Sequence, residues 1–187
     1  MTSTIKFGAP ILAAAIAFGA PALAQNTMVG GAEMLPGKTI VENASASADH
    51  TTLVAAVQAA GLVETLSGPG PFTVFAPTDA AFEKLPAGTV EDLLKPENKD
   101  KLVQILSCHV VSADAMSPAI GRMIADDGGA HTVETLGGCM LNATIRDSDN
   151  ALQLTDENGN VATVNIPDVD QSNGVVHVID TVMLPAM

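Results

Sequence analysis

The stretch that decides the fold is Thr73-Val74-Phe75-Ala76-Pro77-Thr78-Asp79-Ala80-Ala81-Phe82. Its first residues are β-branched or aromatic, which predicts a short strand that ends at Pro77. Thr78 can cap the following helix, and Asp79 then lies in the first helical turn, where the helix dipole favours an anion. The stretch therefore predicts a strand that runs directly into a capped helix.

The residues around this stretch show the spacing of short helices. Leu53, Val57 and Ala60 recur at intervals of four and three residues, which predicts a helix that begins at Thr52. Further short helices are expected at 39–48, 62–66, 80–85, 90–94 and 99–106. The first half of the chain is therefore predicted to be mostly helical, with a turn at the Gly-Pro-rich segment 68–71.

After Cys108 the hydrophobic period changes towards two, which is typical of strands. Strands are predicted at 109–111, 131–136, 140–146, 152–154, 161–164 and 175–179, with one or two short helices at 115–125. Asn158-Gly159 predicts a hairpin because both residues tolerate positive φ. We therefore expect an α+β domain whose second half is an antiparallel sheet or small sandwich, closed by the strand around Val74.

The first 24 residues have the pattern of a secretory signal peptide. Lys6 precedes an apolar run from Ile11 to Phe18, and Ala22-Leu23-Ala24 supplies the small residues for cleavage before Gln25. The alternative is a membrane anchor, but a span needs about 20 apolar residues, and glycine and proline interrupt this run. We expect a secreted or periplasmic protein with no membrane span in the mature chain. Residues 25–37 show no periodicity and are expected to form a flexible leader.

Composition excludes several classes of partner. The chain of 187 residues carries 21 Asp and Glu against 8 Lys and Arg, and its formal net charge is −13. Such an acidic chain is a poor ligand for nucleic acid and for anionic lipid. Tyr and Trp are absent, so the usual stacking platforms for bases and sugars are missing. With 47 % hydrophobic residues, the length suits one domain with a substantial core.

The sequence contains no recognised catalytic or cofactor motif. It lacks the Gly-x-Ser-x-Gly elbow, the His-Glu-x-x-His zinc motif and a phosphate loop. The segments 147–152 and 156–161 start like calcium loops but have no glycine at the sixth position. The four histidines are scattered without metal-ligand spacing, and His109 and His177 lie in apolar runs that favour core or interface positions. We expect no enzyme activity, no cofactor and no bound metal.

Cys108 and Cys139 are the only cysteines and lie 31 positions apart. In an oxidising compartment such a pair commonly forms a disulfide. Closing a loop of this length stabilises a protein by about 3 to 4 kcal/mol in the chain-entropy account. The alternative is two separately buried thiols, and the disulfide is our expectation.

Three blocks of the sequence together resemble the fasciclin-type domain. The stretch 73–82 resembles the first signature block of that family, and 173–185 resembles the second. Between them, Leu106-Ser107-Cys108-His109-Val110-Val111 resembles the family's Tyr-His-Val-Val segment, with Cys108 where Tyr is usual. The blocks occur in the family's order and cover about 38–185.

The resemblance implies a fasciclin-type fold in which the helices of the first half pack on a wedge of two mostly antiparallel β-sheets. It implies adhesion or interaction with a protein, matrix or cell-surface partner, without catalysis, and we expect a monomer. Pro167-Asp168-Val169 occupies the place of the family's receptor-contact segment. His109 lies in the Tyr-His-Val-Val segment, which is also linked to adhesion in the family. A disulfide between Cys108 and Cys139 would replace the packing of the missing Tyr.

A second function remains open at the level of sequence. The chain could be a periplasmic small-ligand or metal-binding protein, and this alternative predicts a defined pocket with convergent polar groups at His131 or His177.

Overall fold

The computed structural model describes residues 26–186, so the expected signal peptide at 1–24 lies outside the described residues. The elements in chain order are β1 (Met28–Val29), β2 (Ala32–Glu33), α1 (Ile40–Ala46), α2 (Thr51–Ala60), α3 (Val63–Ser67), β3 (Phe72–Pro77), α4 (Asp79–Glu83), α5 (Thr89–Leu93), η1 (Pro96–Asn98), α6 (Lys99–Ser107), β4 (Val110–Val111), α7 (Ser117–Asp126), β5 (Ala130–Glu134), β6 (Met140–Ile145), β7 (Leu152–Thr155), β8 (Val161–Gln171) and β9 (Gly174–Ile179). The α+β class and the helical first half are confirmed.

The deciding stretch folds as its sequence predicts. β3 ends at Pro77, and the Thr78 hydroxyl accepts a hydrogen bond from the Ala81 N–H at the start of α4. Asp79 does more than complement the dipole of its own helix, because its carboxylate also accepts the backbone N–H groups of Thr51 and Thr52. One side chain therefore joins the first turn of α4 to the first turn of α2.

The expected wedge of two sheets is wrong, because seven of the described strands form one main sheet. Its order is β4-β3-β9-β8-β7-β6-β5, and all neighbours are antiparallel except β3 and β9. The strand β8 has 11 residues and pairs with β7 near its start and with β9 along the rest. Because the long strand β8 pairs with strands of both halves, the two sheets that the resemblance implies are one continuous sheet.

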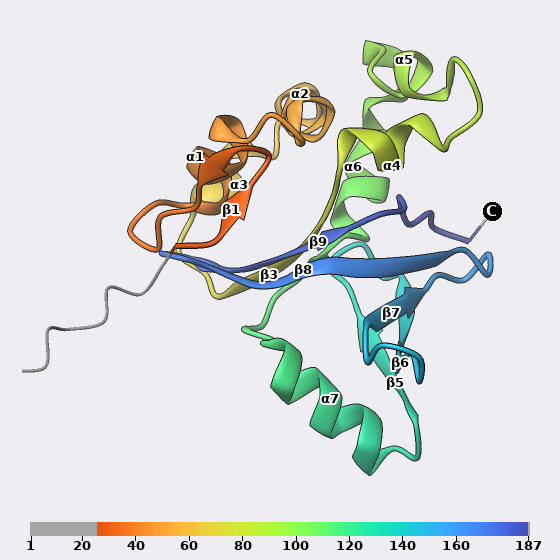
Figure 1. Ribbon diagram of the computed structural model, residues 1–187. Coiled ribbons are helices and arrows are strands. Elements are labelled where there is room, and N and C mark those ends of the chain that lie inside the picture. The colour runs from red at the N-terminus through yellow and green to blue at the C-terminus, as the bar shows by residue number, and fades with distance from the viewer. Residues whose placement is uncertain (1–25, 187) are drawn as a thin grey trace, which may run out of the picture.

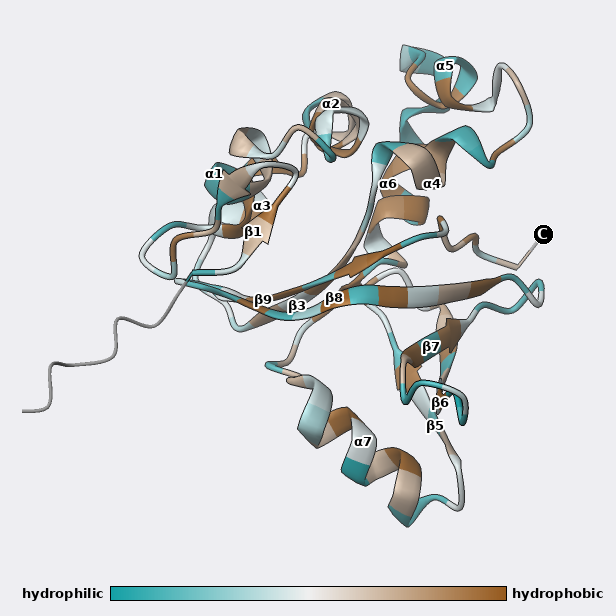
Figure 2. Cartoon of the chain, viewed as in Figure 1, coloured by the Kyte–Doolittle hydropathy of each residue, from teal (hydrophilic) through white to brown (hydrophobic). Residues whose placement is uncertain are grey.

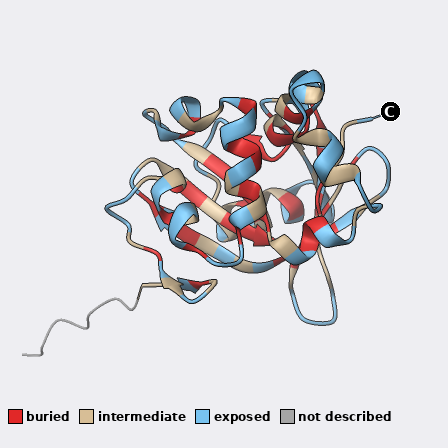
Figure 3. Cartoon of the chain, turned by 90° about the horizontal axis from the view of Figure 1, so that it is seen from above, coloured by how far each residue is buried: buried red, intermediate tan, exposed pale blue. Residues whose placement is uncertain are grey.

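Helices cover the two faces of the central strands unequally. In Figure 1, α1 to α6 lie on one side of β3, β9 and β8, while α7 and the strands β5 to β7 lie on the other. Side chains of β3 point both ways: Val74 and Ala76 join the core beneath the helices, and Phe75 joins the core beside α7. Figure 2 shows the hydrophobic central strands, and Figure 3 shows their burial. This two-sided burial explains why β3 is apolar on both faces from Val74 to Pro77.

The two edges of the main sheet approach each other through the turn between β5 and β6. The N–H of Leu136 donates to the carbonyl of Val110 in β4 at 2.7 Å, and Gly137 donates to Ser107 at the end of α6 at 3.0 Å. A disulfide joins Cys108 to Cys139 at the same place, with 5.3 Å between the Cα atoms. The sheet is therefore nearly closed, and the expected disulfide is present at its seam.

The segment expected to be a flexible leader differs in the structure. Within it, β1 and β2 form a small antiparallel hairpin. Val29 and Met34 are buried against Val169 and Val178 of the main sheet. These four apolar side chains form a third core, which fixes the hairpin beside α1. The sequence pattern did not predict it, because the residues in contact lie too far apart in the chain to produce a local hydrophobic period.

Candidate interaction site

The segment that the sequence presents as a contact site lies where β8 is irregular. The pairing of β8 with β9 shifts register between Val164 and Ile166 and again between Ile166 and Val169. Asp168 has a left-handed φ of 56°. As a result the three residues have different surroundings: Pro167 is exposed, Asp168 is partly buried and Val169 is buried at 1 % exposure.

Asp168 caps the start of α7 from outside the helix. The backbone N–H of Ser117 donates to Asp168 Oδ1 at 2.6 Å, and the Ser117 hydroxyl donates to Oδ2. The preceding residue, Met116, makes no side-chain cap. A carboxylate at this position satisfies free N–H groups and complements the helix dipole. Asp168 therefore anchors α7 to β8.

His177 continues the same network below Asp168. Its Nδ1 accepts the backbone N–H of Asp168 at 3.2 Å, and its Nε2–H donates to the Ala115 carbonyl at 2.8 Å. Its ring stacks on Phe75 with 5.5 Å between the ring centroids. Burial lowers the pKa of His177, although the Ala115 carbonyl and the Asp168 charge oppose that effect. His177 is thus neutral at pH 7 and fixes the segment that leads into α7.

An open hollow of about 330 Å³ lies between the start of α7, the β6–β7 hairpin and the irregular part of β8. Its apolar lining comes from Pro118, Ile145, Ala151, Leu152, Val164 and Pro167. We call this hollow the Pro167 groove. Ser117, which Asp168 holds in place, and Asn150 supply its polar lining.

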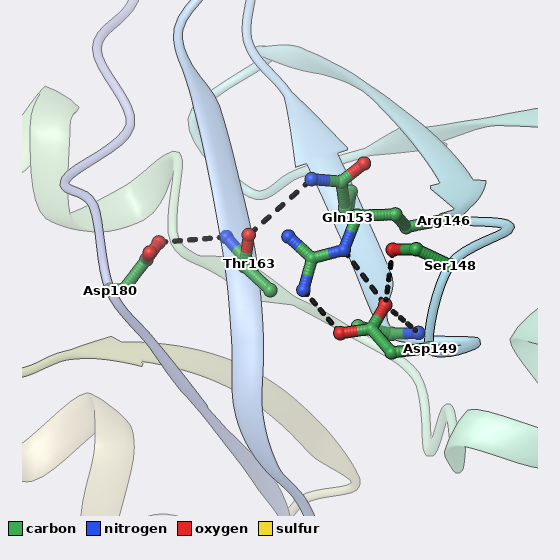
Figure 4. Close-up of polar contacts among 7 residues, drawn as sticks. Arg146, Ser148, Asp149, Gln153, Thr163 and Asp180 are labelled. Atoms are coloured by element: carbon green, nitrogen blue, oxygen red, sulfur yellow. Dashed lines mark hydrogen bonds and ion pairs between the residues drawn. The ribbon is translucent and has the colours of Figure 1, made fainter.

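The turn between β6 and β7 borders this groove and is held by its own charges. Arg146 donates to both carboxylate oxygens of Asp149, at 2.8 and 2.5 Å (Figure 4). These hydrogen bonds lower the pKa of Asp149 to about 2. Asn150 follows in a left-handed conformation with φ 56° and donates its N–H to the Arg146 carbonyl. The groove wall formed by Asn150 and Ala151 is therefore a locally braced turn.

Figure 4 also shows how β7 and β8 are joined to the chain beyond β9. The Thr163 N–H donates to Asp180 at 2.8 Å, and the Gln153 amide donates to the Thr163 hydroxyl at 3.4 Å. These bonds tie β7, β8 and the segment after β9 to one another.

His109 lies inside the protein, at 2 % exposure. Its Nδ1–H donates to the Ile105 carbonyl at 2.8 Å, and its Nε2 accepts the N–H of Met183 at 3.0 Å. Burial lowers the pKa of His109 to about 4. The side chain therefore joins α6 to the C-terminal segment as a neutral imidazole, and it is separate from the Pro167 groove.

The residues of the alternative function do not come together. His131 pairs with Asp127 at 2.5 Å on the surface, whereas both ring nitrogens of His177 are used within the network described above. In the part of the chain from 26 to 186, no three His, Cys, Asp or Glu side chains are grouped as metal ligands. Over that same range, no helix has the length and apolar character needed to cross a bilayer.

Sequence reasoning located the segment 167–169 but missed most of its neighbours. Ser117 and Pro118 carry a recognisable signal, since Ser-Pro is common at a helix start. The partner of Ser117 is a carboxylate 51 positions away, and local spacing contains no information about that pairing.

The family model described as Fasciclin domain matches residues 48–185. Protein sll1483 of Synechocystis is 52 % identical over 149 residues, which cover 80 % of this chain and 74 % of the relative. Cell surface glycolipoprotein MPB83 of Mycobacterium bovis is 40 % identical over 124 residues, covering 66 % of this chain and 48 % of the relative. This chain therefore accounts for about half of MPB83.

A solved structure of a fasciclin domain pair, from the insect cell adhesion molecule Fasciclin I, has a similar fold. The TM-score is 0.56 at 23 % identity, and the match covers 68 % of this chain and 42 % of the other. At that identity the likeness concerns the fold alone.

Proposed function

This chain belongs to the fasciclin domain family, and from that premise we propose that it is an exported, non-enzymatic interaction module that binds a protein, matrix or cell-surface partner through the Pro167 groove. The family is associated with adhesion and surface proteins, and its members are generally not enzymes. Two of the matched proteins are named as a cell surface glycolipoprotein and a cell adhesion molecule.

Export is part of the proposal. Cleavage between Ala24 and Gln25 would release a secreted or periplasmic protein, in which the segment before residue 38 packs as a hairpin on the fasciclin-type domain of 38–185. The disulfide between Cys108 and Cys139 supports this location, because such bonds form and persist in oxidising compartments.

The observation that carries the contact site is the Pro167 groove itself. Two exposed prolines, Pro118 and Pro167, line this groove, which is open to solvent and has a mostly apolar set of lining residues. Within the segment 167–169, Pro167 has the exposed side chain, whereas Val169 belongs to the core and Asp168 holds α7. Contact by Pro167 and positioning by Asp168 are therefore the roles we propose.

The test is capture or adhesion with the purified mature protein on matrix and cell-surface extracts. Replacing both Pro118 and Pro167 by alanine should weaken binding about tenfold, equivalent to ~1.4 kcal/mol. Pro96→Ala is the matched control, since Pro96 is also exposed but lies in η1, away from the groove. Equal binding by the double variant, the control and the wild type would remove the groove from the proposal.

Substitutions of Asp168 separate positioning from contact. Asp168→Ala should loosen α7 and cost about 1 kcal/mol, because the Ser117 N–H loses its acceptor. Asp168→Asn keeps an oxygen acceptor and tolerates the left-handed backbone, so α7 and binding should both be retained. If Asp168→Asn abolishes binding while hydrogen exchange in α7 is unchanged, the carboxylate contacts the partner itself.

A further inference from the structure

We propose that Asn158 is a site of spontaneous deamidation in the folded protein, and that its conversion releases the C-terminal segment 184–186 from the turn between β7 and β8. Asn158-Gly159 lies in that turn, and Figure 1 shows the C-terminal end of the chain beside it. The exposed Asn158 is not part of the Pro167 groove, so the inference does not depend on the function proposed above.

The reaction needs only water. The backbone nitrogen of Gly159 loses its proton and attacks the side-chain carbonyl carbon of Asn158, and the side-chain nitrogen leaves as ammonia. Water then opens the resulting succinimide ring at either carbonyl, which gives aspartate or isoaspartate. One water is consumed and one ammonia is released, with no oxidation. A glycine after the asparagine favours the attack, because it has no Cβ to hinder the approach and its backbone adopts many conformations.

The sequence contains two Asn-Gly pairs, and the second pair, at Asn173, is held tightly. The side-chain oxygen of Asn173 accepts the N–H of Ile40 at the start of α1, at 3.1 Å. Its side-chain nitrogen donates to the carbonyls of Leu66 and Gly68 at the end of α3, at 2.8 and 3.0 Å. The Asn173 side chain therefore cannot turn towards the next backbone nitrogen unless these elements separate.

Asn158 is less constrained. Its side-chain nitrogen donates to the carbonyls of Leu184 and Pro185 at 3.1 and 2.9 Å, whereas its side-chain oxygen accepts no hydrogen bond within the range 26–186. The N–H of Gly159 donates to the Asp156 carbonyl at 3.0 Å. Such hydrogen bonds in an exposed turn open locally far more often than the whole fold unfolds. The folded protein therefore permits deamidation here and hinders it at the other pair.

The same turn holds the end of the chain. Besides the two bonds from Asn158, the N–H of Leu184 donates to the Asp156 carboxylate at 2.9 Å, and the N–H of Ala186 donates to the Glu157 carboxylate at 3.1 Å. Asn158 is the member of this set that donates to the segment, while the two acidic side chains accept from it. The segment 184–186 is therefore held by bonds of both directions.

Deamidation reverses the part that Asn158 plays. A carboxylate accepts hydrogen bonds but cannot donate them, so the carbonyls of Leu184 and Pro185 lose their donor. The new negative charge faces those two carbonyl oxygens and follows two acidic residues in the chain, and like charges repel. The segment 184–186 is thereby released. Met183 stays in place, because it is buried and its N–H donates to His109.

The first experiment incubates the folded mature chain at mildly alkaline pH and follows both Asn-Gly pairs by peptide mapping with mass spectrometry. Conversion is read from the mass change when an amide NH₂ becomes OH. We expect Asn158 to convert at least about tenfold faster than Asn173 in the folded protein. In urea the two rates should become similar, because both asparagines precede glycine and the folded contacts are gone.

The second experiment measures amide hydrogen exchange in Asn158→Asp, which carries the product side chain. The N–H groups of Leu184 and Ala186 should exchange several-fold faster than in the wild type, and that of Met183 should be unchanged. Asn165→Asp is the matched control. It adds the same charge at an exposed residue of β8 whose side chain makes no hydrogen bond to any residue from 26 to 186, so exchange should match the wild type.

The proposal is wrong if Asn158 does not convert in the folded protein, or if it converts no faster there than Asn173. It is also wrong if Asn158→Asp exchanges like the wild type at Leu184 and Ala186. If Asn158→Asp fails to fold, the exchange is measured on aged wild-type protein, whose deamidated fraction is separated by anion exchange through its added charge.

Discussion

At the scale of single residues, the burial of His109 makes the stability of the protein depend on pH. Its pKa is about 4 in the folded protein against 6.5 for an ordinary histidine. Between these values the unfolded chain binds more protons, so the free energy of unfolding falls as the pH falls. The contribution of His109 to the free energy of unfolding is complete above pH 6.5 and is lost as the pH falls to about 4. It amounts to roughly 3 kcal/mol, because each unit of pKa difference corresponds to about 1.36 kcal/mol.

We expect the wild type to lose roughly 2 to 3 kcal/mol more than His109→Gln between pH 7 and pH 4.5. Urea unfolding at both pH values measures this difference, and the other titrating groups are shared by the two proteins. Parallel pH profiles would show that His109 does not carry the effect.

Two glycines with opposite surroundings give a second prediction. Gly174 has φ of 152°, and a Cβ there would lie 1.9 Å from the Phe72 carbonyl oxygen. Gly121 lies in α7, and a Cβ there would meet no atom within 4 Å. Gly174→Ala should therefore lower the free energy of unfolding by at least about 2 kcal/mol, whereas Gly121→Ala should raise it by about 0.5 to 1 kcal/mol. Thermal unfolding of both variants checks the signs, and a neutral Gly174→Ala would contradict the close approach.

Single residues also mark the limit of what the sequence predicts about the site. The segment 167–169 was located by its resemblance to a family motif, but side-chain directions along it were not predictable. A regular strand alternates its faces, whereas the register shifts of β8 break the alternation between Ile166 and Val169. The burial of Val169 and the capping role of Asp168 follow from that irregularity.

At the scale of elements, the disulfide ties the end of α6 to the turn that precedes β6. Cys108 and Cys139 are both buried there, beside the bonds that Leu136 and Gly137 make across the seam. Replacing both cysteines by alanine should cost about 3 kcal/mol, since the unfolded chain regains the freedom of a 31-residue loop.

The disulfide prediction is measured by urea unfolding with and without reductant. In mass spectrometry the oxidised wild type should be two hydrogens lighter than its reduced form. Reductant should lower the free energy of unfolding of the wild type and leave that of the double alanine variant unchanged. The double alanine variant is the control, because reductant has no bond to break there. Equal sensitivity of the two proteins would contradict the prediction.

Elements were more predictable from the sequence than their arrangement. Local periods located the helices and most strands, including the hairpin at Asn158-Gly159. They did not predict that β3 lies parallel to β9, since a pairing across about a hundred residues leaves no local pattern. They also presented β8 as a short strand, and its full length is what makes the sheet single.

At the scale of the whole molecule, the β1–β2 hairpin raises the question of where the folding unit begins. The resemblance starts at about residue 38, yet Val29 and Met34 are buried at 3 % and 5 % exposure against β8 and β9. Burying a side chain of this size contributes about 1.5 to 3 kcal/mol. The free energy of unfolding of a chain that begins at Lys38 should therefore be about 3 to 5 kcal/mol lower than that of a chain that begins at Gln25.

Two neighbouring substitutions make the same prediction without truncation. Val29→Ala removes buried methyl groups and should cost about 1 to 2 kcal/mol, whereas Met28→Ala, at 57 % exposure, should leave stability nearly unchanged. Urea unfolding of the two variants and the two chain lengths measures all four values. If the shorter chain and Val29→Ala are as stable as the full mature chain, the hairpin is dispensable and the domain begins at 38. If both are weakened, the segment before the family match is part of the cooperative core.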